Sequence, residues 1–320
     1  MFNKLKRAFR PFEVMSFVYK SGFYLKKIEG CLYLCKKGNE KKIAIKNGNL
    51  LSIYRQIRDF ARLFDYFIKK NITVMEDKFY ISDVNGIDMY IKREKDDEYT
   101  IPTMFFYFTE SIKDFEEPSA ELVGYTKKRD IEPNDIVFDC GAFHGWFSIY
   151  AAKKAKNGHV YCFEPDTPNI KILRENIELN NLKNVTVVPE VLAEKTGFVS
   201  FYETGTVSSK IVESGDKFGS NTVVKKLPSV SIKDFCLREK IKTVNFIKMD
   251  VEGAECEIVK GSNTFIENNV EFFAIASYHI ISEAPSSKIL EPLFSSIGFQ
   301  VETAYPRHQT TYAWKAIPKK

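Results

Sequence analysis

Two short stretches carry residues whose types and spacing could bind a ligand. In the first, DIVFDCGAFHG, an apolar strand ends near Asp139 and runs into a loop framed by Gly141 and Gly145. The second, HVYCFEP, is typical of the next strand and ends on Glu164. Open α/β sheets hold adenosine-type ligands with this combination, because glycine lets the backbone approach and the distal carboxylate accepts hydrogen bonds from ribose hydroxyls.

The residues of the glycine loop distinguish between adenosine ligands. A dinucleotide fingerprint, G-x-G-x-x-G, brings a helix N-terminus to a pyrophosphate. Here Phe143 replaces the middle glycine, and the carboxylate of Asp139 would repel a pyrophosphate. S-adenosylmethionine (SAM) carries an ammonium and a sulfonium group and no phosphate, so the loop favours SAM. An ordinary βα turn without a ligand is the alternative.

A second acidic stretch, NFIKMDVEGAE, ends a hydrophobic strand abruptly at Asp250 and continues with Glu252 and Glu255. Such acids can steer a cationic cofactor, accept a substrate proton or bind a divalent metal. The position of Asp250 at the strand tip predicts a functional role. Glu255 fits the start of a helix, where acids interact favourably with the helix dipole. Asp250 and Glu252 are candidate metal ligands, and dependence on a metal stays open.

His279, at the end of the segment FFAIASYH, is the predicted general base. Methyl transfer to a hydroxyl needs alignment and the removal of one proton, because a sulfonium is already a strong electrophile. His144, inside the glycine loop, is the second choice. A structural histidine at a strand end is the alternative interpretation of His279.

Ligands of open α/β sheets bind beyond the carboxyl ends of the strands, so the predicted site consists of residues at strand ends. The predicted catalytic residues are His279 and Asp250. Leu192, after the third strand, is expected to flank an adenine. The predicted cofactor-binding residues are Asp139, Gly141, Phe143, His144, Gly145, Glu164, Leu192 and Asp250.

The elements that position these residues alternate from residue 135 onward, which predicts an α/β fold with a parallel-rich, doubly wound sheet. Residues 203–221, rich in glycine and serine, predict a mobile loop near the ligand. The last two strands are expected to form a hairpin. Strands are predicted at 136–140, 159–163, 184–189, 244–249, 271–276, 298–303 and 311–317, and helices near 146–155, 168–180, 254–267 and 286–296.

Residues 1–100 do not follow this rhythm and are expected to form a smaller α+β N-terminal module of unknown role. An amphipathic helix is predicted at about 50–68, with apolar residues at three- and four-residue spacing. Residues 101–130 are expected to connect this module to a ligand-binding domain at 131–320. Strands of the module are predicted at 22–25, 31–35, 42–46, 78–82 and 87–92.

The composition is that of a globular protein of 320 residues with a net charge of +5 and 44% hydrophobic residues. The basic residues are scattered, so nucleic acid is not an expected partner. No apolar run approaches the ~18 residues that span a bilayer. The six cysteines are interpreted as free thiols, and the predicted location is the cytoplasm. The basic N-terminus could touch a membrane surface weakly.

Four stretches occur in the order typical of one known family: DIVFDCGAFHGWFSIYAA, VYCFEPDTPNIKILRENIELNNLKNVTVVPEVLAEKTG, SVSIKDF and NFIKMDVEGAE. They resemble the FkbM-family SAM-dependent methyltransferases, over roughly residues 120–305. The resemblance implies a class I methyltransferase sheet of seven strands with the last antiparallel. It also implies that Asp139, Gly141 and Gly145 line the methionine part of SAM and that Glu164 holds the ribose. Asp250 falls at the family's fourth-strand acid.

The chain departs from this family in two places. Ser277 stands where the family often has an acid, two residues before the histidine of the fifth strand, which weakens a carboxylate-supported pair at His279. Residues 1–100 match nothing in the family's shared core and are candidates for setting substrate choice or a homo-oligomeric state.

The function predicted from these observations is SAM-dependent O-methylation of a hydroxyl on a glycan sugar or a glycosylated metabolite. The glycan acceptor follows from family tendency, and Tyr278, Tyr305, Tyr312 and Trp314 could stack on sugar rings. The alternatives are a nicotinamide-dependent oxidoreductase, a nucleic-acid methyltransferase and a non-catalytic SAM-fold scaffold.

Overall fold

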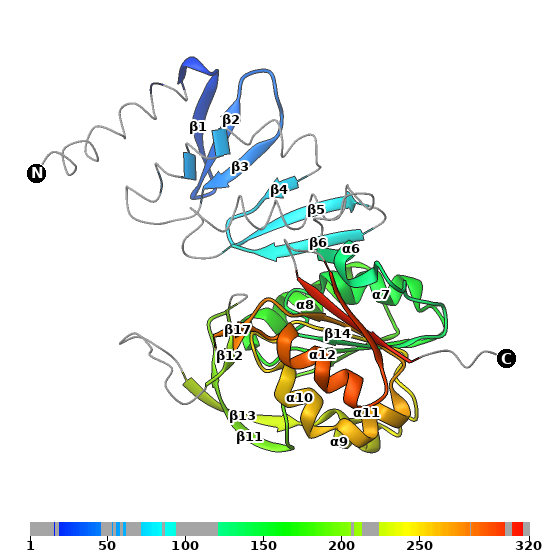
Figure 1. The fold of residues 1–320 in the computed structure, drawn as a ribbon. Coiled ribbons are helices and arrows are strands. Elements are labelled where there is room, and N and C mark those ends of the chain that lie inside the picture. The colour runs from blue at the N-terminus through cyan, green and yellow to red at the C-terminus, as the bar shows by residue number, and fades with distance from the viewer. Residues whose placement is uncertain are drawn as a thin grey trace, which may run out of the picture. The chain divides into compact units, whose positions relative to one another are not determined.

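The computed structural model describes most of the chain (Figure 1). The chain divides into two compact units, residues 1–110 and 111–320. The described residues are 19–45, 72–84, 87–93, 121–205, 208–212, 224–281, 283–304 and 309–315, with single helical positions at 16, 53, 56, 57, 60 and 61.

The second unit is built on a seven-stranded sheet. In spatial order its strands are β18 (Gln300–Ala304), β19 (Thr310–Trp314), β15 (Phe272–Ala276), β14 (Phe246–Met249), β7 (Ile136–Cys140), β8 (His159–Phe163) and β9 (Val185–Val188). β19 runs antiparallel to both of its neighbours, and the remaining pairs are parallel. The predicted doubly wound sheet with an antiparallel last strand is confirmed. Its strand order reverses between β14 and β7, where such sheets bind ligands.

Helices cover both faces of this sheet, as Figure 1 shows. One face carries α6 (Glu121–Thr126), α7 (Trp146–Lys154) and α8 (Thr167–Leu179). The other carries α9 (Ile232–Glu239), α10 (Glu255–Gly261), α11 (Asn263–Asn269) and α12 (Ser287–Ser296). Every residue of β14 and β15 is buried, which explains why these strands are nearly continuous apolar runs in the sequence.

The strands and helices predicted from residue 135 onward are confirmed, with one correction. The single helix predicted at 254–267 is wrong, because the chain breaks at Ser262 into α10 and α11. A side-chain carbon on Gly261 would lie 2.1 Å from the Glu194 carbonyl oxygen, so the backbone of residue 194 passes at the position where the helix ends.

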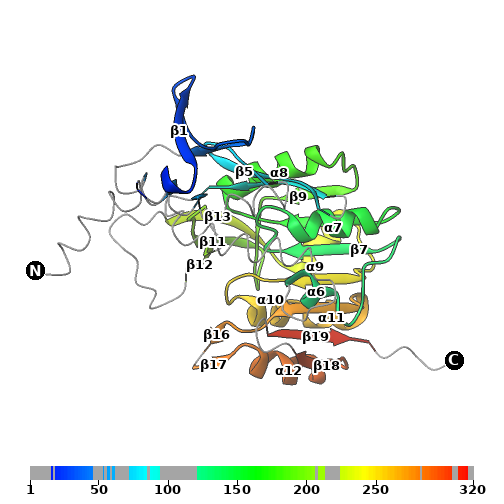
Figure 2. The ribbon, with the colours of Figure 1, turned by 90° about the horizontal axis from the view of Figure 1, so that it is seen from above.

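A second, four-stranded sheet was not predicted. It consists in spatial order of β10 (Val191–Leu192), β13 (Val224–Val230), β11 (Gly197–Tyr202) and β12 (Lys210–Ile211). The loop predicted at 203–221 is wrong at Lys210 and Ile211, because these two residues form β12 and pair with β11. Residues 206, 207 and 213–221 of the predicted loop lie outside the described ones. Figure 2 shows this sheet and the hairpin of β16 (Ile280–Ile281) and β17 (Ala284–Pro285) at the same end of the large sheet.

The first unit contains two antiparallel three-stranded sheets. These are β1 (Phe23–Ile28), β2 (Cys31–Lys36) and β3 (Lys42–Ile45), and β4 (Ile72–Val74), β5 (Lys78–Val84) and β6 (Ile87–Lys92). The five strands predicted in this unit are confirmed, and β4 was not predicted. The described positions of the predicted helix at 50–68 are helical, and the others lie outside the described residues.

Arg93 holds the first unit together from its interior. Its guanidinium donates to the carbonyl of Ala44 at 2.9 Å, to the carbonyl of Met75 at 2.8 Å and to Gln56 Oε1 at 2.7 Å. It also lies 5.3 Å and 5.5 Å from the ring centroids of Phe60 and Phe79. An arginine that is 2% exposed needs such partners, because an unpaired buried charge is strongly destabilising.

No helix within the described ranges is long and apolar enough to cross a membrane. All six cysteines are free thiols, as predicted. The basic N-terminus and residues 101–120 of the predicted connector lie outside the described residues.

Candidate active site

The glycine loop lies directly against the end of β14. Gly141 has a φ of +77° and Gly145 a φ of +86°, backbone conformations that favour glycine. A side-chain carbon on Gly141 would stand only 1.8 Å from the carbonyl oxygen of Asp250. This close approach brings the glycine loop after β7, which is the predicted ligand loop, together with the acidic segment after β14.

Asp139, at the tip of β7, is fully buried and has protein partners. Its carboxylate accepts a hydrogen bond from Ser148 Oγ at 2.5 Å and lies 3.1 Å from the Lys248 ammonium. Lys248 also donates to the carbonyl of Gly141 at 2.8 Å. Asp139 therefore stabilises the strand tips, and the predicted contact between its carboxylate and a cofactor stays a prediction.

Replacing Lys248 by Met is expected to lower the free energy of unfolding by about 3–5 kcal/mol, because it leaves the Asp139 carboxylate buried without a counter-charge. Lys248 itself is only 6% exposed at the side chain, so water cannot take its place. Chemical denaturation of the variant and the wild type measures the difference.

The double variant Asp139→Asn, Lys248→Met is the control for this prediction. It removes both charges, so most of the lost stability is expected to return. If Lys248→Met alone costs less than about 1 kcal/mol, the pair is solvated and the assignment is wrong.

Glu164 closes the other side of the glycine loop from the end of β8. Its carboxylate accepts the backbone N–H groups of Phe143 at 2.7 Å and Asp166 at 3.1 Å. Burial raises the pKa of Glu164 to about 8, although these two hydrogen bonds oppose the shift. A buried carboxyl that already accepts N–H groups suits the recognition of further donors such as ribose hydroxyls.

Of the other predicted cofactor-binding residues, Phe143 is half-buried, and His144 and Leu192 are buried. Phe143 has a φ of +50°, and its ring is stacked on that of His144 with centroids 3.7 Å apart. His144 is 1% exposed, which makes it a poor second choice as a base. Leu192 is 4% exposed and belongs to the main hydrophobic core, so its burial needs no adenine.

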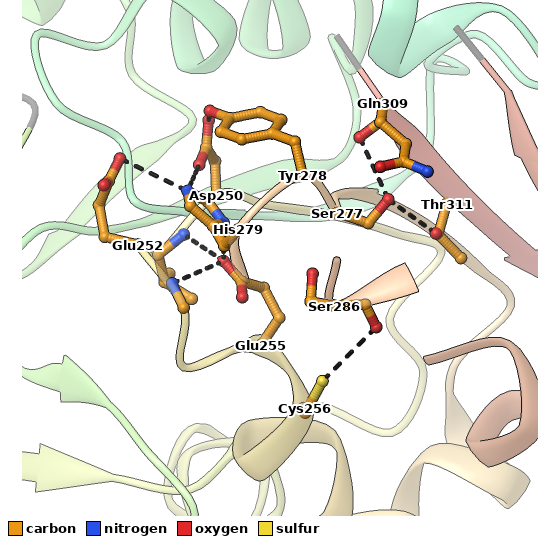
Figure 3. Close-up of polar contacts among 12 residues, drawn as sticks. Asp250, Glu252, Glu255, Cys256, Ser277, Tyr278, His279, Ser286, Gln309 and Thr311 are labelled. Atoms are coloured by element: carbon orange, nitrogen blue, oxygen red, sulfur yellow. Dashed lines mark hydrogen bonds and ion pairs between the residues drawn. The ribbon is translucent and has the colours of Figure 1, made fainter. Parts of the chain in front are cut away.

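The predicted base His279 lies among three carboxylates, shown in Figure 3. Its Nε2 is 3.7 Å from Asp250 Oδ1 and 3.7 Å from Glu252 Oε1. Its Nδ1 is 3.0 Å from Oε1 of Glu255, which is fully buried. We call Asp250, Glu252, Glu255 and His279 the His279 cluster.

These carboxylates determine the charge of His279. Burial by itself lowers its pKa, but the contacts with Glu252 and Glu255 and the charge of Asp250 outweigh burial and raise the pKa to about 10. In this state the ring is an imidazolium at neutral pH and cannot take up a proton. His279 can therefore act as the predicted general base only after another group has displaced this ring proton.

Ser277 weakened the case for a carboxylate-supported pair at His279, but three carboxylates surround the ring. The support comes from the segment after β14 and not from position 277, where Ser277 bonds to the carbonyl of Gln309 and to Thr311 (Figure 3). Glu255 is the first residue of α10, as predicted, but it also accepts the backbone N–H groups of Val251 and Gly253. The spacing D-x-E-x-x-E was the signal in the sequence for this arrangement.

Sequence reasoning missed Tyr125, whose hydroxyl donates to Asp250 Oδ2 at 3.0 Å. No local motif identifies it, because it lies 125 positions away in the chain. The hydroxyl of Tyr278 is 3.4 Å from the same carboxylate oxygen, and its side chain is among the exposed large ones. Tyr312 is fully buried and bonds to the carbonyl of Gly124, so its predicted stacking on a sugar is wrong. Tyr305 lies outside the described residues.

Comparison with known proteins gives partial matches to several methyltransferases. The chain is 24% identical over 163 residues to hexuronic acid methyltransferase AglP of Haloferax volcanii, which covers 50% of this chain and 63% of that protein. It is 32% identical over 84 residues to the ribosomal protein L11 methyltransferase of Thermoanaerobacter pseudethanolicus, covering 26% of this chain and 27% of that protein.

A solved structure of methyltransferase FkbM from Methylobacillus flagellatus KT matches with a TM-score of 0.42 and 17% identity, covering 82% of this chain and 61% of that one. The chain thus spans less than two thirds of each of these three relatives. A family model, the methyltransferase FkbM domain, matches residues 139–300, about half of the chain. The chain belongs to the FkbM methyltransferase family.

Proposed function

We propose that this protein is a SAM-dependent O-methyltransferase that acts on a hydroxyl of a glycan sugar or a glycosylated metabolite. The observation that carries the proposal is the contact between Gly141 and the Asp250 carbonyl, which joins the ligand loop to the His279 cluster. A loop for a cationic adenosine ligand and a group of acids beside it are the two parts that methyl transfer to a hydroxyl requires.

The residues of the loop fit SAM. Gly141 and Gly145 keep the backbone close, and the Glu164 carboxyl stands at the tip of β8, where a ribose would lie. Bound SAM supplies a methyl group on a sulfonium. Transfer of this methyl group to a hydroxyl would give S-adenosylhomocysteine and release the hydroxyl proton, which the Asp250 carboxylate beside His279 would accept because the ring is already protonated. Asp250 and His279 are the proposed catalytic residues.

Two observations support a sugar as the acceptor. The relative AglP is a hexuronic acid methyltransferase, although its identity to this chain is only 24%. The exposed Tyr278 and Ile280 flank His279 in the sequence, and an aromatic ring beside polar groups suits a sugar, which has apolar faces and hydroxyl edges.

The direct test of the cofactor is calorimetric titration with S-adenosylhomocysteine. We expect binding by the wild type, loss in Glu164→Ala and retention in Glu178→Ala, an exposed acid on α8. Asp139 is unsuitable for this test, because its removal would leave the buried Lys248 ammonium without a counter-charge. No binding by folded wild type would contradict the proposal and favour the oxidoreductase or the scaffold alternative. Titration with NADH would then distinguish these two alternatives.

The acceptor is tested separately, by measuring the transfer of a labelled methyl group from SAM to a panel of hexuronic acids and deoxysugars.

The raised pKa of Glu164 predicts a pH dependence of stability. Because its pKa of about 8 in the folded state exceeds the ordinary 4.5, the folded chain binds more protons than the unfolded chain between these values. The free energy of unfolding should therefore fall as the pH rises through this window, by up to about 5 kcal/mol from this group.

Comparing the stability of the wild type with that of Glu164→Gln separates the titration of Glu164 from the titration of all other groups, which the two proteins share. Denaturation at pH 5.5, 7 and 9 should show the wild type losing stability relative to the variant as the pH rises. A constant difference would mean that the Glu164 carboxyl is ionised throughout.

A further inference from the structure

The spacing of donor atoms in the His279 cluster is unusual for a hydrogen-bonded group. His279 Nε2 stands 3.7 Å from a carboxylate oxygen of Asp250 and 3.7 Å from one of Glu252. These distances are too long for hydrogen bonds. The three donor atoms nevertheless all lie within 4.8 Å of one another.

This spacing matches the donor shell of a divalent cation. Hard divalent cations hold their ligands at about 2.1–2.4 Å, so neighbouring ligand atoms stand roughly 3–4 Å apart. Asp250 and Glu252 come from the segment after β14, and His279 from the segment after β15, so the fold places three donors from two strand ends around one point (Figure 3).

The opposite side of the His279 ring has the support that metal-binding histidines need. Glu255 Oε1 lies 3.0 Å from Nδ1, and Glu255 is fully buried. The backbone N–H groups of Val251 and Gly253 hold that oxygen in place. A carboxylate at Nδ1 orients the ring and keeps Nε2 as the metal-binding nitrogen.

Several buried atoms of the cluster lack a hydrogen-bond partner among the described residues. They are Asp250 Oδ1, Nε2 of His279 and Oε2 of the fully buried Glu255, whereas Nδ1 of His279 has the ion pair with Glu255 Oε1. Three carboxylates around one histidine also leave an excess of negative charge, whether the ring is neutral or protonated. Unpaired polar atoms and excess negative charge are costly in a buried site, and a divalent cation beside Asp250 and His279 Nε2 would partner these two atoms and offset the charge.

We propose that Asp250, Glu252 and His279 bind a divalent cation, with Glu255 as the residue that positions His279. Two carboxylates and one imidazole, with no thiolate, suit Mn²⁺ or Mg²⁺, and three protein ligands leave positions open for a substrate hydroxyl. The use of the cation, as a Lewis acid that makes this hydroxyl easier to deprotonate, rests on the proposed function. The binding of the cation does not.

Binding is tested directly by titrating the full-length, EDTA-treated protein with Mn²⁺ and measuring free Mn²⁺ by electron paramagnetic resonance. We expect a single Mn²⁺ per chain with a dissociation constant below about 1 mM, displaced by excess Mg²⁺. Glu252→Gln and His279→Gln should each weaken binding by at least about tenfold. Among the described residues, no backbone group bonds to the Glu252 side chain, which is 33% exposed. Its variant therefore keeps the test valid if His279→Gln does not fold.

The matched control is Glu257→Gln, an exposed acid on α10 paired with Lys260, which should leave Mn²⁺ binding unchanged. The inference is overturned if folded wild type does not bind Mn²⁺, or if Glu252→Gln binds it as tightly as the wild type. Titration with S-adenosylhomocysteine on the same samples separates the two proposals: Mn²⁺ binding without S-adenosylhomocysteine binding refutes only the methyltransferase function, and the reverse refutes only the cation site.

Discussion

Replacing His279 by Gln is expected to lower the rate of methyl transfer by about 10²–10⁴-fold while leaving S-adenosylhomocysteine binding close to that of the wild type. Three carboxylates surround the ring: those of Asp250 and Glu252 lie near Nε2, and that of Glu255 lies near Nδ1. Glutamine keeps a polar side chain but removes the positive charge or metal-binding nitrogen that organises them. The loss should therefore appear in kcat and not in the affinity for the cofactor product.

His159→Gln is the matched control for this substitution. His159 begins β8, at the other end of that strand from Glu164, and its Nε2 is 2.8 Å from Thr186 Oγ1. Its loss should change the rate by less than about twofold, since it contacts nothing in the site. Turnover of a sugar acceptor with labelled SAM measures both variants. Equal rates for His279→Gln and the wild type would remove His279 from the mechanism.

Replacing Gly141 by Ala is expected to abolish S-adenosylhomocysteine binding and to lower the free energy of unfolding by more than about 3 kcal/mol. The added carbon would stand 1.8 Å from the Asp250 carbonyl oxygen, which belongs to backbone and cannot rotate away. The loop or the end of β14 must move, and either movement separates the ligand loop from the His279 cluster.

Gly298→Ala separates this clash from simple backbone strain. Gly298 has a φ of +79°, close to the +77° of Gly141, but nothing lies within 4 Å of an added carbon there. It should cost only about 1–2 kcal/mol, the ordinary penalty for a left-handed alanine, and leave ligand binding intact. Thermal unfolding and calorimetry measure both variants. Equal behaviour of the two would mean that the glycine loop is not packed against Asp250.

The outcome for Glu255 illustrates how a correct local prediction can miss a tertiary contact. Its position predicted a helix start, and it is the first residue of α10. The same carboxylate reaches His279 across the strand ends, because β14 and β15 are neighbours in the sheet. A sequence pattern describes the helix, but the distance to a residue 24 positions later depends on how the strands pair.

The sequence by itself determined the alternating α/β order, the glycine loop and the acids at the strand tips. These features are local: buried parallel strands need continuous apolar runs, and a backbone with a φ near +77° at Gly141 favours glycine. They were sufficient to predict a sheet of this type and to select Asp139, Glu164, Asp250 and His279 from the whole chain.

Only the tertiary structure decided which of these residues meet. It paired Asp139 with Lys248, gathered the acids after β14 around His279 and brought Tyr125 to Asp250. It also formed the four-stranded sheet of β10, β13, β11 and β12, in which β10 and β12 have only two residues each and therefore no detectable period. Contacts of this kind depend on strand order and on the burial of charge, and neither quantity is encoded in a local pattern of residues.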